Sequence, residues 1–428
     1  MSIMTKASAS FKKDGLRGLI VSICHFLIRH CSKSNTTMRA SENRQEDSHA
    51  LKLDPSSRYW FVNDSPFGQH IHPQDIDPDT INWLVPAFEN SSGGHLTIFR
   101  LIRDMENLGF KNRIVFEHNI KGKTVEEVRA LIKSNFLPID CPISFGADSL
   151  APAYFTFATN WTTAYLLRNF ISTIEKCYIL QDYEPYFYPR GTDYYLAERT
   201  YGFGFKTFAG GDWLVNQLKS KHNVTAAIFP FGCDHALYTP AAQLNKPHGT
   251  KTLLFYARPS TPRRGFELGM LAFEKLLAKL NNVQILLAGC DLSAYELPAN
   301  IKSVGIVPMS ELPQLYRNCD VALIISFTNV SLLPLDLMAS GCTVVSNSGP
   351  QVEWLLNDQI AMLSEADPDS LFLALEKILT DDNLRQQKIK AASHFVAGQH
   401  WTIAAKLIAD NLRQTQKYCQ ERQMSVIS

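Results

Sequence analysis

Charged residues are scarce in this chain of 428 residues. Asp, Glu, Lys and Arg together make up 19% of the sequence, whereas 45% is hydrophobic and 11% is aromatic. A disordered chain has the reverse balance, so the composition excludes wholesale disorder and predicts large buried cores. The formal net charge of +1 argues against a general nucleic-acid-binding protein. At roughly 150 residues per domain, the chain has room for two or three domains.

Paired cysteines are also lacking. The nine cysteines include no CxxC pair and show no Cys/His spacing typical of a metal site. Several lie beside or inside apolar runs, such as Cys177 in "KCYIL" and Cys319 in "YRNCDVALII". Buried free thiols in a reducing compartment are the simplest interpretation, and they favour a cytoplasmic protein.

The apolar run near the N-terminus is too short to cross a membrane. Residues 16–30, "LRGLIVSICHFLIRH", contain an apolar run of roughly 12 residues, interrupted by Ser22 and His25, whereas a spanning helix needs about 20. No A-x-A cleavage site follows, as a signal peptide would require. Residues 1–40 carry a charge of +6, which fits a peripheral anchor on an anionic membrane surface; a functionless extension is the alternative. Residues 32–55 are rich in Ser, Asn, Arg and Asp, and this polar composition predicts a disordered linker.

Two familiar phosphate-binding motifs are absent from the Gly-rich stretch "ENSSGGHLTIFRLIRDMENLGF" at residues 89–110. No Lys-Ser/Thr follows the glycines, and there is no GxGxxG. The stretch nevertheless joins an expected strand to an amphipathic helix and a further strand, which predicts a βαβ unit. Gly93 and Gly94 would let a ligand approach the backbone, and the free N–H groups of the helix would favour an anion. A tight turn without a ligand is the alternative.

Strands and helices alternate in two series, from about residue 56 to 240 and again from residue 251. The segment "YTPAAQLNKPHGTK" reads as a linker between them. We therefore expect an α/β fold with two facing Rossmann-like doubly wound domains at residues 56–245 and 246–400 and a cleft between them. Residues 1–55 would precede them and a helix at 401–428 would follow. Ligands of such sheets bind on the loops that follow the strands.

The loop "RPSTPRRG", residues 258–265, follows an expected strand and opens a helix. Its guanidiniums at Arg258, Arg263 and Arg264, stiffened by two prolines, predict a clamp for a diphosphate. A solvated basic loop is the alternative.

The segment "FTNVSLLPLDLMASG" follows another expected strand. Asp336 lies within an apolar helical stretch, where a buried carboxylate needs partners such as ligand hydroxyl groups. Ser331 is expected at the start of that helix, where it can cap the backbone or meet a phosphate. A structural carboxylate and cap is the alternative for the pair.

The loop "QDYEPYFYPRG", residues 181–191, combines carboxylates with aromatic rings. Directed acceptors and flat apolar faces are what carbohydrate recognition needs, so Tyr183, Glu184 and Tyr188 are candidates for binding the acceptor. Asp182 lies at the strand end and is the candidate nearest the reacting centre. A packed aromatic loop is the alternative.

Several of these segments together, namely "QDYEPYFYPRGTDYYLAERTYGFG", "FGCDHALYTP", "LLFYARPSTPRRGFELG" and "SLLPLDLMASGCTVVSN", resemble the WsaF-type rhamnosyltransferases. These are bacterial glycosyltransferases related to the large retaining GT-B family 4. "GGHLTIFRLIRDMENLGF" resembles the Gly-rich loop of the same group. The likeness covers roughly residues 56–400.

The resemblance implies roles for individual residues. Gly93, Gly94 and His95 would lie beside the donor diphosphate and sugar, and we count His95 with Asp182 as catalytic candidates. Arg258, with Arg263 or Arg264, would neutralise the pyrophosphate, so that no metal is required.

Asp336 matches the second carboxylate of the family's Glu-x7-Glu motif, which bonds the nucleotide ribose. Thr328 stands where the first glutamate is expected. Asp-x-Asp spacings also occur, at Asp75/Asp77/Asp79 and at Asp367/Asp369, but their Pro-containing polar surroundings predict turns.

The resemblance therefore implies a GT-B glycosyltransferase without cofactor or metal. It does not extend to the N-terminal 55 residues; the thiols and the basic N-terminal segment are what favour a cytoplasmic protein that associates peripherally with the membrane. It would transfer L-rhamnose from dTDP-L-rhamnose to a growing surface polysaccharide, with its partners a nucleotide sugar and a glycan acceptor. Two alternatives remain: a GT-B enzyme that uses another nucleotide sugar, and a non-catalytic glycan-binding protein of the same fold.

Overall fold

The computed structural model describes residues 58–63, 65–88, 92–240, 249–293 and 296–427. The expected membrane anchor and linker within residues 1–55 lie outside this set. The described chain divides into two compact units, one formed by the residues up to Asp234 together with those from Gly398 onward, the other by His235–Ala397. The sequence-based limits were residues 245 and 400. Each unit is an α/β unit built on a parallel sheet, the fold class that the sequence predicts.

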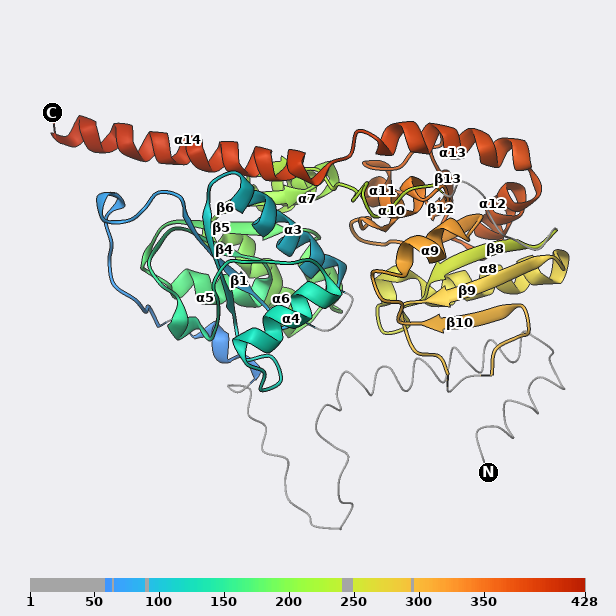
Figure 1. Ribbon diagram of the computed structural model, residues 1–428, viewed down its shortest axis with the longest axis horizontal. Helices are drawn as coiled ribbons and strands as arrows, with labels where there is room; N and C mark the ends of the chain where they lie inside the picture. The colour runs from blue at the N-terminus through green and yellow to red at the C-terminus, as the bar shows by residue number, and fades with distance from the viewer. Residues whose placement is uncertain (1–57, 64, 89–91, 241–248, 294–295, 428) are drawn as a thin grey trace, which may run out of the picture. The chain divides into compact units, whose positions relative to one another are not determined.

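The N-terminal unit holds a seven-stranded parallel sheet in the order β3-β2-β1-β4-β5-β6-β7 (Figure 1). Its strands are β1 (Thr80–Val85), β2 (Lys111–Phe116), β3 (Ile143–Phe145), β4 (Ala153–Ala158), β5 (Thr173–Leu180), β6 (Lys206–Gly210) and β7 (Ala226–Phe229). Its helices are α3 (Gly93–Asn107), α4 (Val125–Asn135), α5 (Trp161–Asn169), α6 (Thr192–Arg199) and α7 (Asp212–His222), with short 3-10 turns that include η2 (Pro73–Asp75) and η4 (Glu184–Phe187). The central strands β1 and β4 are buried along their whole length, as expected of strands covered on both faces.

The last helix, α14 (Trp401–Ile427), belongs to the N-terminal unit and packs on α3 and β7. Arg413 of α14 donates a hydrogen bond to the carbonyl of Leu108 at 2.9 Å. The guanidinium of Arg100, buried on α3, lies 5.2 Å from the ring centroid of Trp401 and 3.8 Å from the carboxylate of Asp234. The chain therefore returns to its first unit, a placement that local sequence patterns do not indicate.

The C-terminal unit holds a six-stranded parallel sheet in the order β10-β9-β8-β11-β12-β13. Its strands are β8 (Lys251–Tyr256), β9 (Val283–Ala288), β10 (Ile301–Gly305), β11 (Val321–Ile324), β12 (Thr343–Asn347) and β13 (Met362–Ser364). Its helices are α8 (Phe266–Lys279), α9 (Leu312–Arg317), α10 (Leu333–Ala339), α11 (Pro350–Glu353), α12 (Pro368–Thr380) and α13 (Asp382–Val396), with the turn η6 (Pro262–Arg264) before α8.

Alternate residues of β8 serve opposite faces of this second sheet, as the period of two requires. Leu253 and Phe255 lie in the core that the sheet forms with α8 and α12. Leu254 and Tyr256 instead line a pocket toward α9 and α10. The sheet is thus covered by helices on both faces, which leaves the strand ends as the places open to a ligand.

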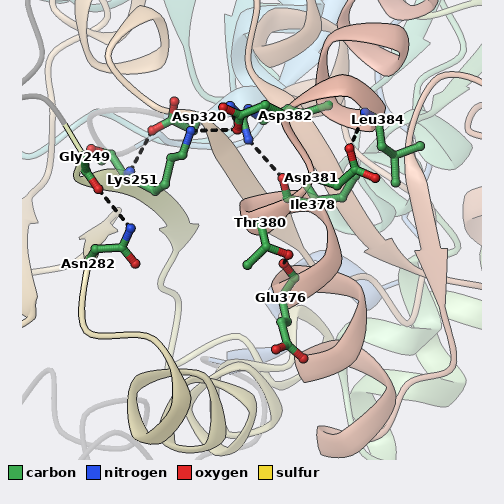
Figure 2. A network of polar contacts seen from close by, with 12 residues as sticks. Gly249, Lys251, Asn282, Asp320, Glu376, Ile378, Thr380, Asp381, Asp382 and Leu384 are labelled. Carbon is green, nitrogen blue, oxygen red and sulfur yellow. Dashed lines mark hydrogen bonds and ion pairs between the residues drawn. The ribbon is translucent and has the colours of Figure 1, made fainter.

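Polar contacts at the amino ends of the strands hold this unit together (Figure 2). Lys251, the first residue of β8, pairs with Asp382 of α13 at 2.9 Å. Asp320, just before β11, accepts a hydrogen bond from the backbone N–H of Thr252 at 2.8 Å. Arg385 bonds both Asp382 and the carbonyl of Ile378. These contacts link α13 to the start of β8 and, through Arg385, to α12.

Candidate functional site

Each sheet has one point where the strand order reverses direction. In the C-terminal unit it lies between β8 and β11, and in the N-terminal unit between β1 and β4. In open parallel sheets the loops that follow such a pair of strands diverge and leave a crevice at their carboxyl ends. The candidate residues of the C-terminal unit, Arg258–Arg264 and Phe327–Asp336, follow β8 and β11. The Gly-rich segment follows β1.

The arginine loop after β8 is fixed by contacts at both ends. The guanidinium of Arg258 donates to the hydroxyl of Tyr256, with the Nη2–O distance at 2.6 Å. Arg264 donates from Nη1 to Oγ of Ser326, also at 2.6 Å. Gly265 closes the turn with φ 59°, and a Cβ there would come within 2.5 Å of Ile325, so the loop lies hard against the end of β11. The arginines are partly exposed and held in place, which suits a preorganised anion clamp.

A buried polar network joins this loop to the strand ends, and the sequence analysis missed it. Ser326 and Asn347, which follow β11 and end β12, exchange two hydrogen bonds: the Ser326 N–H donates to Asn347 Oδ1 at 2.8 Å, and Asn347 Nδ2 donates to the Ser326 carbonyl at 3.0 Å. Gln351 also donates to that carbonyl, at 3.1 Å. Asn329 accepts a hydrogen bond from the indole of Trp354 at 2.7 Å. Polar residues at the ends of two apolar strands were the signal that could have found this network.

An apolar pocket lies beside the arginine loop, on the sheet face that α9 and α10 cover. Its lining comes from the carboxyl halves of the strands and from both helices: Leu254, Tyr256, Ala288, Leu312, Tyr316, Ala322, Leu323, Ile324, Leu333 and Leu337. Tyr256 contacts both the pocket and the arginine loop, because its ring lines the pocket and its hydroxyl accepts a hydrogen bond from the guanidinium of Arg258. The hollow is only water-sized, at about 10 Å³, so it is a packing gap between the sheet and these helices.

The two candidate residues of the segment that follows β11, Ser331 and Asp336, lie in different surroundings. Asp336 is buried on α10, as expected, with an exposed fraction of 3%. The helix begins at Leu333 and not at Ser331, whose hydroxyl accepts a long hydrogen bond from the Leu333 N–H at 3.4 Å. Ser331 therefore precedes the N-cap residue of α10, which is Leu332, while Thr328, at the position of the expected glutamate, is buried.

The Gly-rich segment forms the first turn of α3, and this corrects the expectation that it precedes the helix. Gly93 and Gly94 are exposed helical residues, with Ser92 as the N-cap. A Cβ on Gly94 would meet Gln181 and Ser92 only at 3.7 Å or more, which is ordinary van der Waals contact. The protein itself therefore does not require glycine at position 94.

His95 ties this turn to the end of β1. Its Nε2 lies 3.1 Å from the carbonyl of Pro86, which can only accept, so Nε2 carries the proton. Nδ1 then accepts from the hydroxyl of Ser92 at 2.8 Å. Burial lowers the pKa of His95, so the ring is neutral near pH 7. Both ring nitrogens are engaged, and the geometry supports a positioning role; its expected catalytic role stays a prediction.

The loop after β5 turns inward, which changes the interpretation of two candidates. Tyr183 is fully buried, with its hydroxyl 3.1 Å from Glu198 and 2.8 Å from His222. Glu184 is buried too and accepts a hydrogen bond from the hydroxyl of Tyr178. Burial raises the pKa of Glu184 to about 8, so this carboxyl is protonated near neutral pH. The protein itself covers both side chains in this structure, so burial disfavours their direct contact with a glycan, which stays a prediction.

The two other candidates of this loop differ in exposure, because Asp182 is buried whereas Tyr188 is partly exposed. Asp182 follows the end of β5 and has an exposed fraction of 7%; its Oδ1 accepts a hydrogen bond from the Tyr183 N–H at 2.8 Å. Tyr188 is partly exposed, and its hydroxyl accepts a hydrogen bond from the indole N–H of Trp161 at 3.0 Å. Tyr186, which was not a candidate, is more exposed, at 37%.

One further carboxyl group at this edge escaped the sequence analysis. Glu117 directly follows β2, next to β1, and accepts a hydrogen bond from the hydroxyl of Thr162 at 2.8 Å. Burial raises its pKa, with the Thr162 bond opposing the shift. The signal was present in "RIVFEH", where a Glu-His pair ends an expected strand.

No group of three or more His, Cys, Asp or Glu residues suited to a metal was found in the part of the chain that the structure describes. The Asp-x-Asp spacings are turns and caps, as expected. Asp77 accepts from the N–H of Asp79, and Asp367 caps α12 by accepting from Asp369 and Ser370. The expectation that no metal is needed stays a prediction.

The fold is shared with several solved structures. Sucrose-phosphate synthase from Thermosynechococcus elongatus aligns with a TM-score of 0.62 at 15% identity, covering 78% of this chain and 98% of that one. Anabaena Alr3699/HepE, solved in complex with UDP and glucose, aligns with a TM-score of 0.61 at 14% identity, covering 78% and 99%. Two Rossmann-like units on one chain, with these relatives, define a GT-B fold.

Comparison of the amino-acid sequence with known proteins indicates which glycosyltransferases the chain is similar to. Residues 251–376 match the family described as WsaF, C-terminal domain. The O-antigen biosynthesis protein RfbC of Myxococcus xanthus is 32% identical over 355 residues, which is 79% of this chain and 27% of that protein. A phosphatidyl-myo-inositol mannosyltransferase of Mycolicibacterium smegmatis is 28% identical over 43% of this chain and 50% of its own length. The chain thus spans about a quarter to a half of these curated relatives.

These findings confirm the resemblance expected from the motifs. Residues 251–376 match the WsaF C-terminal domain, the chain is similar to RfbC over 79% of its length, and its fold is that of the solved GT-B structures. No helix in the described part of the chain is both long and apolar enough to cross a bilayer.

Proposed function

We propose that this protein is a glycosyltransferase that transfers L-rhamnose from dTDP-L-rhamnose to a growing surface polysaccharide, without a metal. The observation that carries the proposal is the arginine loop at the strand-order reversal of the C-terminal sheet, held by Tyr256 and Ser326. A leaving nucleoside diphosphate develops negative charge, and fixed guanidiniums stabilise that charge without reorganisation.

The chemistry assigned to the donor side uses residues of the C-terminal unit alone. Arg258 and Arg264 bind the diphosphate, and Asp336 on α10 is the residue that the family resemblance assigns to the ribose. On the N-terminal unit, Asp182 is the candidate beside the transferred sugar. Retention of configuration follows from the family resemblance, and Asp182 would serve as the base if the reaction inverts.

The relatives support the glycan part of the proposal more than its choice of donor. The RfbC name refers to O-antigen biosynthesis, which fits a surface polysaccharide as product. The HepE structures hold UDP, with glucose or as UDP-glucose, so a UDP-sugar is a second candidate donor. A cytoplasmic site and an anionic membrane surface as partner follow from the sequence alone.

Calorimetry with dTDP, UDP and GDP, followed by dTDP-L-rhamnose and UDP-glucose, tests the proposal. We expect dTDP to bind more tightly than UDP or GDP, and magnesium chelation to leave its affinity unchanged. Tighter binding of UDP and UDP-glucose would replace the rhamnosyl donor by a glucosyl one. Failure of a folded preparation to bind any nucleotide would contradict glycosyltransfer and favour a glycan-binding protein.

A further inference from the structure

Trp60 holds its indole ring at the surface of the N-terminal unit. It begins the turn η1 (Trp60–Val62), which packs on α5, and its exposed fraction is 37%. The two preceding side chains both donate to the carboxylate of Asp193 on α6, at 2.7 and 2.9 Å. The following residue, Phe61, is buried, with its ring centroid 5.3 Å from that of Trp161. The backbone on both sides of Trp60 is therefore anchored, so the ring is presented from a fixed position.

Polar groups lie directly beside this ring. Single exposed aromatic residues are common on protein surfaces, so these neighbours are what indicate a site. The ring centroid of His118 lies 5.3 Å from that of Trp60, and its Nε2 lies 3.5 Å from Oε1 of Glu117. The other carboxyl oxygen of Glu117 accepts a hydrogen bond from the hydroxyl of Thr162 at 2.8 Å. The His118 side chain is half-exposed and that of Glu117 is 11% exposed, so both can be reached from solvent.

This cluster lies at the edge of the sheet where a ligand is expected. Glu117 directly follows β2, and Trp161, against which η1 packs through Phe61, directly follows β4. β2 and β4 are the two neighbours of β1, and the strand order reverses between β1 and β4. Ligands of open parallel sheets bind at the carboxyl ends of the strands beside such a reversal. The cluster does not depend on the loop after β5, which turns inward.

The combination of groups matches the two kinds of surface on a sugar ring. One face of a pyranose is largely C–H groups, which an indole ring can cover, and its rim carries hydroxyl groups that bond to a carboxyl or an imidazole. A partly exposed ring can hold one unit while the rest of a long glycan extends along the surface. A uronic acid is disfavoured, because its carboxylate would meet the carboxyl group of Glu117.

We propose that Trp60, Glu117 and His118 form a binding site for one neutral sugar unit of the acceptor glycan. Trp60 stacks on the sugar ring, while Glu117, oriented by Thr162, and His118 bond its hydroxyl groups. The inference rests on the proposed function and deepens it by locating a surface for the acceptor on the N-terminal unit.

Saturation-transfer NMR with methyl α-L-rhamnoside, methyl α-D-glucoside and methyl α-D-glucuronide, titrated into the full chain, tests this site. We expect at least one neutral glycoside to bind at millimolar concentration and the glucuronide to bind more weakly. Trp60→Ala should weaken the neutral glycoside by about tenfold or more, through loss of stacking area, whereas Trp60→Phe should retain most of the affinity. Glu117→Gln, which keeps the size of the side chain, should weaken it by about fivefold.

Two controls separate loss of the site from damage to the fold. Tyr418→Ala removes an exposed aromatic ring of α14 in the same unit and should leave glycoside binding unchanged. The affinity for dTDP, measured by calorimetry, should change by less than about twofold in every variant, because the nucleotide is assigned to the other unit.

Unchanged glycoside binding in Trp60→Ala would overturn the inference, and so would a glucuronide that binds as tightly as the neutral sugars. Equal losses of glycoside and dTDP affinity would assign Trp60 to the fold and overturn it as well. A folded wild type that binds dTDP but none of the three glycosides overturns the inference and leaves the proposed function standing. A folded wild type that binds the glycosides but no nucleotide overturns the proposed function, and the acceptor role of the site with it.

Discussion

Two loops at the carboxyl ends of strands, one after β8 and one after β5, were expected to present side chains to a ligand, and they differ in outcome. The loop after β8 keeps its arginines at the surface, held by Tyr256 and Ser326. The loop after β5 turns Tyr183 and Glu184 into the N-terminal core. Guanidiniums are costly to bury, whereas a tyrosine and a protonated carboxyl can be buried once their polar atoms are bonded. Residue type at a strand end thus indicates exposure reliably only for permanently charged groups.

The largest expected effect comes from breaking the clamp after β8. Arg264→Ala should weaken binding of a nucleoside diphosphate by on the order of 2–4 kcal/mol, the range for truncating a charge-assisted contact. Binding of the nucleoside without phosphates should be nearly unchanged. Calorimetry with both ligands measures the difference, and Arg317→Ala, on α9 of the same unit, is the control. Equal losses for both ligands would show that the variant damages the fold and not the clamp.

The second-largest effect is expected at Asp182, in the loop after β5. Asp182→Asn is nearly isosteric, so donor affinity should persist while turnover falls by about 10²-fold if the carboxylate acts on the reacting sugar. Its hydrogen bond to the Tyr183 N–H provides the competing, structural explanation. Turnover and melting temperature measured on one preparation separate the two. A lower melting temperature with normal turnover per folded molecule would assign Asp182 to the fold.

Burial of Glu184 predicts a pH dependence of stability. Its pKa rises from 4.5 in the unfolded chain to about 8 in the folded one, so the folded state holds a proton that the unfolded state releases. This contribution is fully present below about pH 4.5 and is lost as the pH rises toward 8, by at most ~1.4 kcal/mol per pH unit.

Denaturant unfolding of wild type and Glu184→Gln between pH 5 and 8 measures this dependence. Glutamine keeps the neutral shape, so the variant should lose the downward slope with pH. The exposed Glu126→Gln, on α4 of the same unit, should keep the wild-type slope. Parallel slopes in wild type and Glu184→Gln would mean that Glu184 is ionised in the folded protein.

The smallest effect is expected at the opposite, amino edge of the C-terminal sheet. The pair of Lys251 and the exposed Asp382 should contribute less than about 1 kcal/mol to stability. The Lys251 bond lowers the pKa of Asp382, so this contribution is present above the usual aspartate pKa and lost as the pH falls below it. Lys251→Ala should lower the unfolding midpoint slightly and leave nucleotide affinity unchanged. A large loss of nucleotide affinity would contradict the division between a structural and a functional edge.

Short-range patterns in the sequence determined much of this fold. Apolar runs with flanking glycines gave the strands and helices of both units, and Gly109 and Gly341 both have the positive φ expected at helix ends. The arginine loop and buried Asp336 were also predictable, because permanent charge after a strand and a carboxylate in an apolar helix are local features.

The tertiary structure alone decided which side chains of the loop after β5 face outward, since Tyr178, Glu198 and His222 supply the partners that make burial of Tyr183 and Glu184 favourable. It also placed α14 on the first unit and brought Trp60 beside His118. Both depend on packing between residues distant in the chain, whereas periodicity and spacing report only which residues are neighbours within one element.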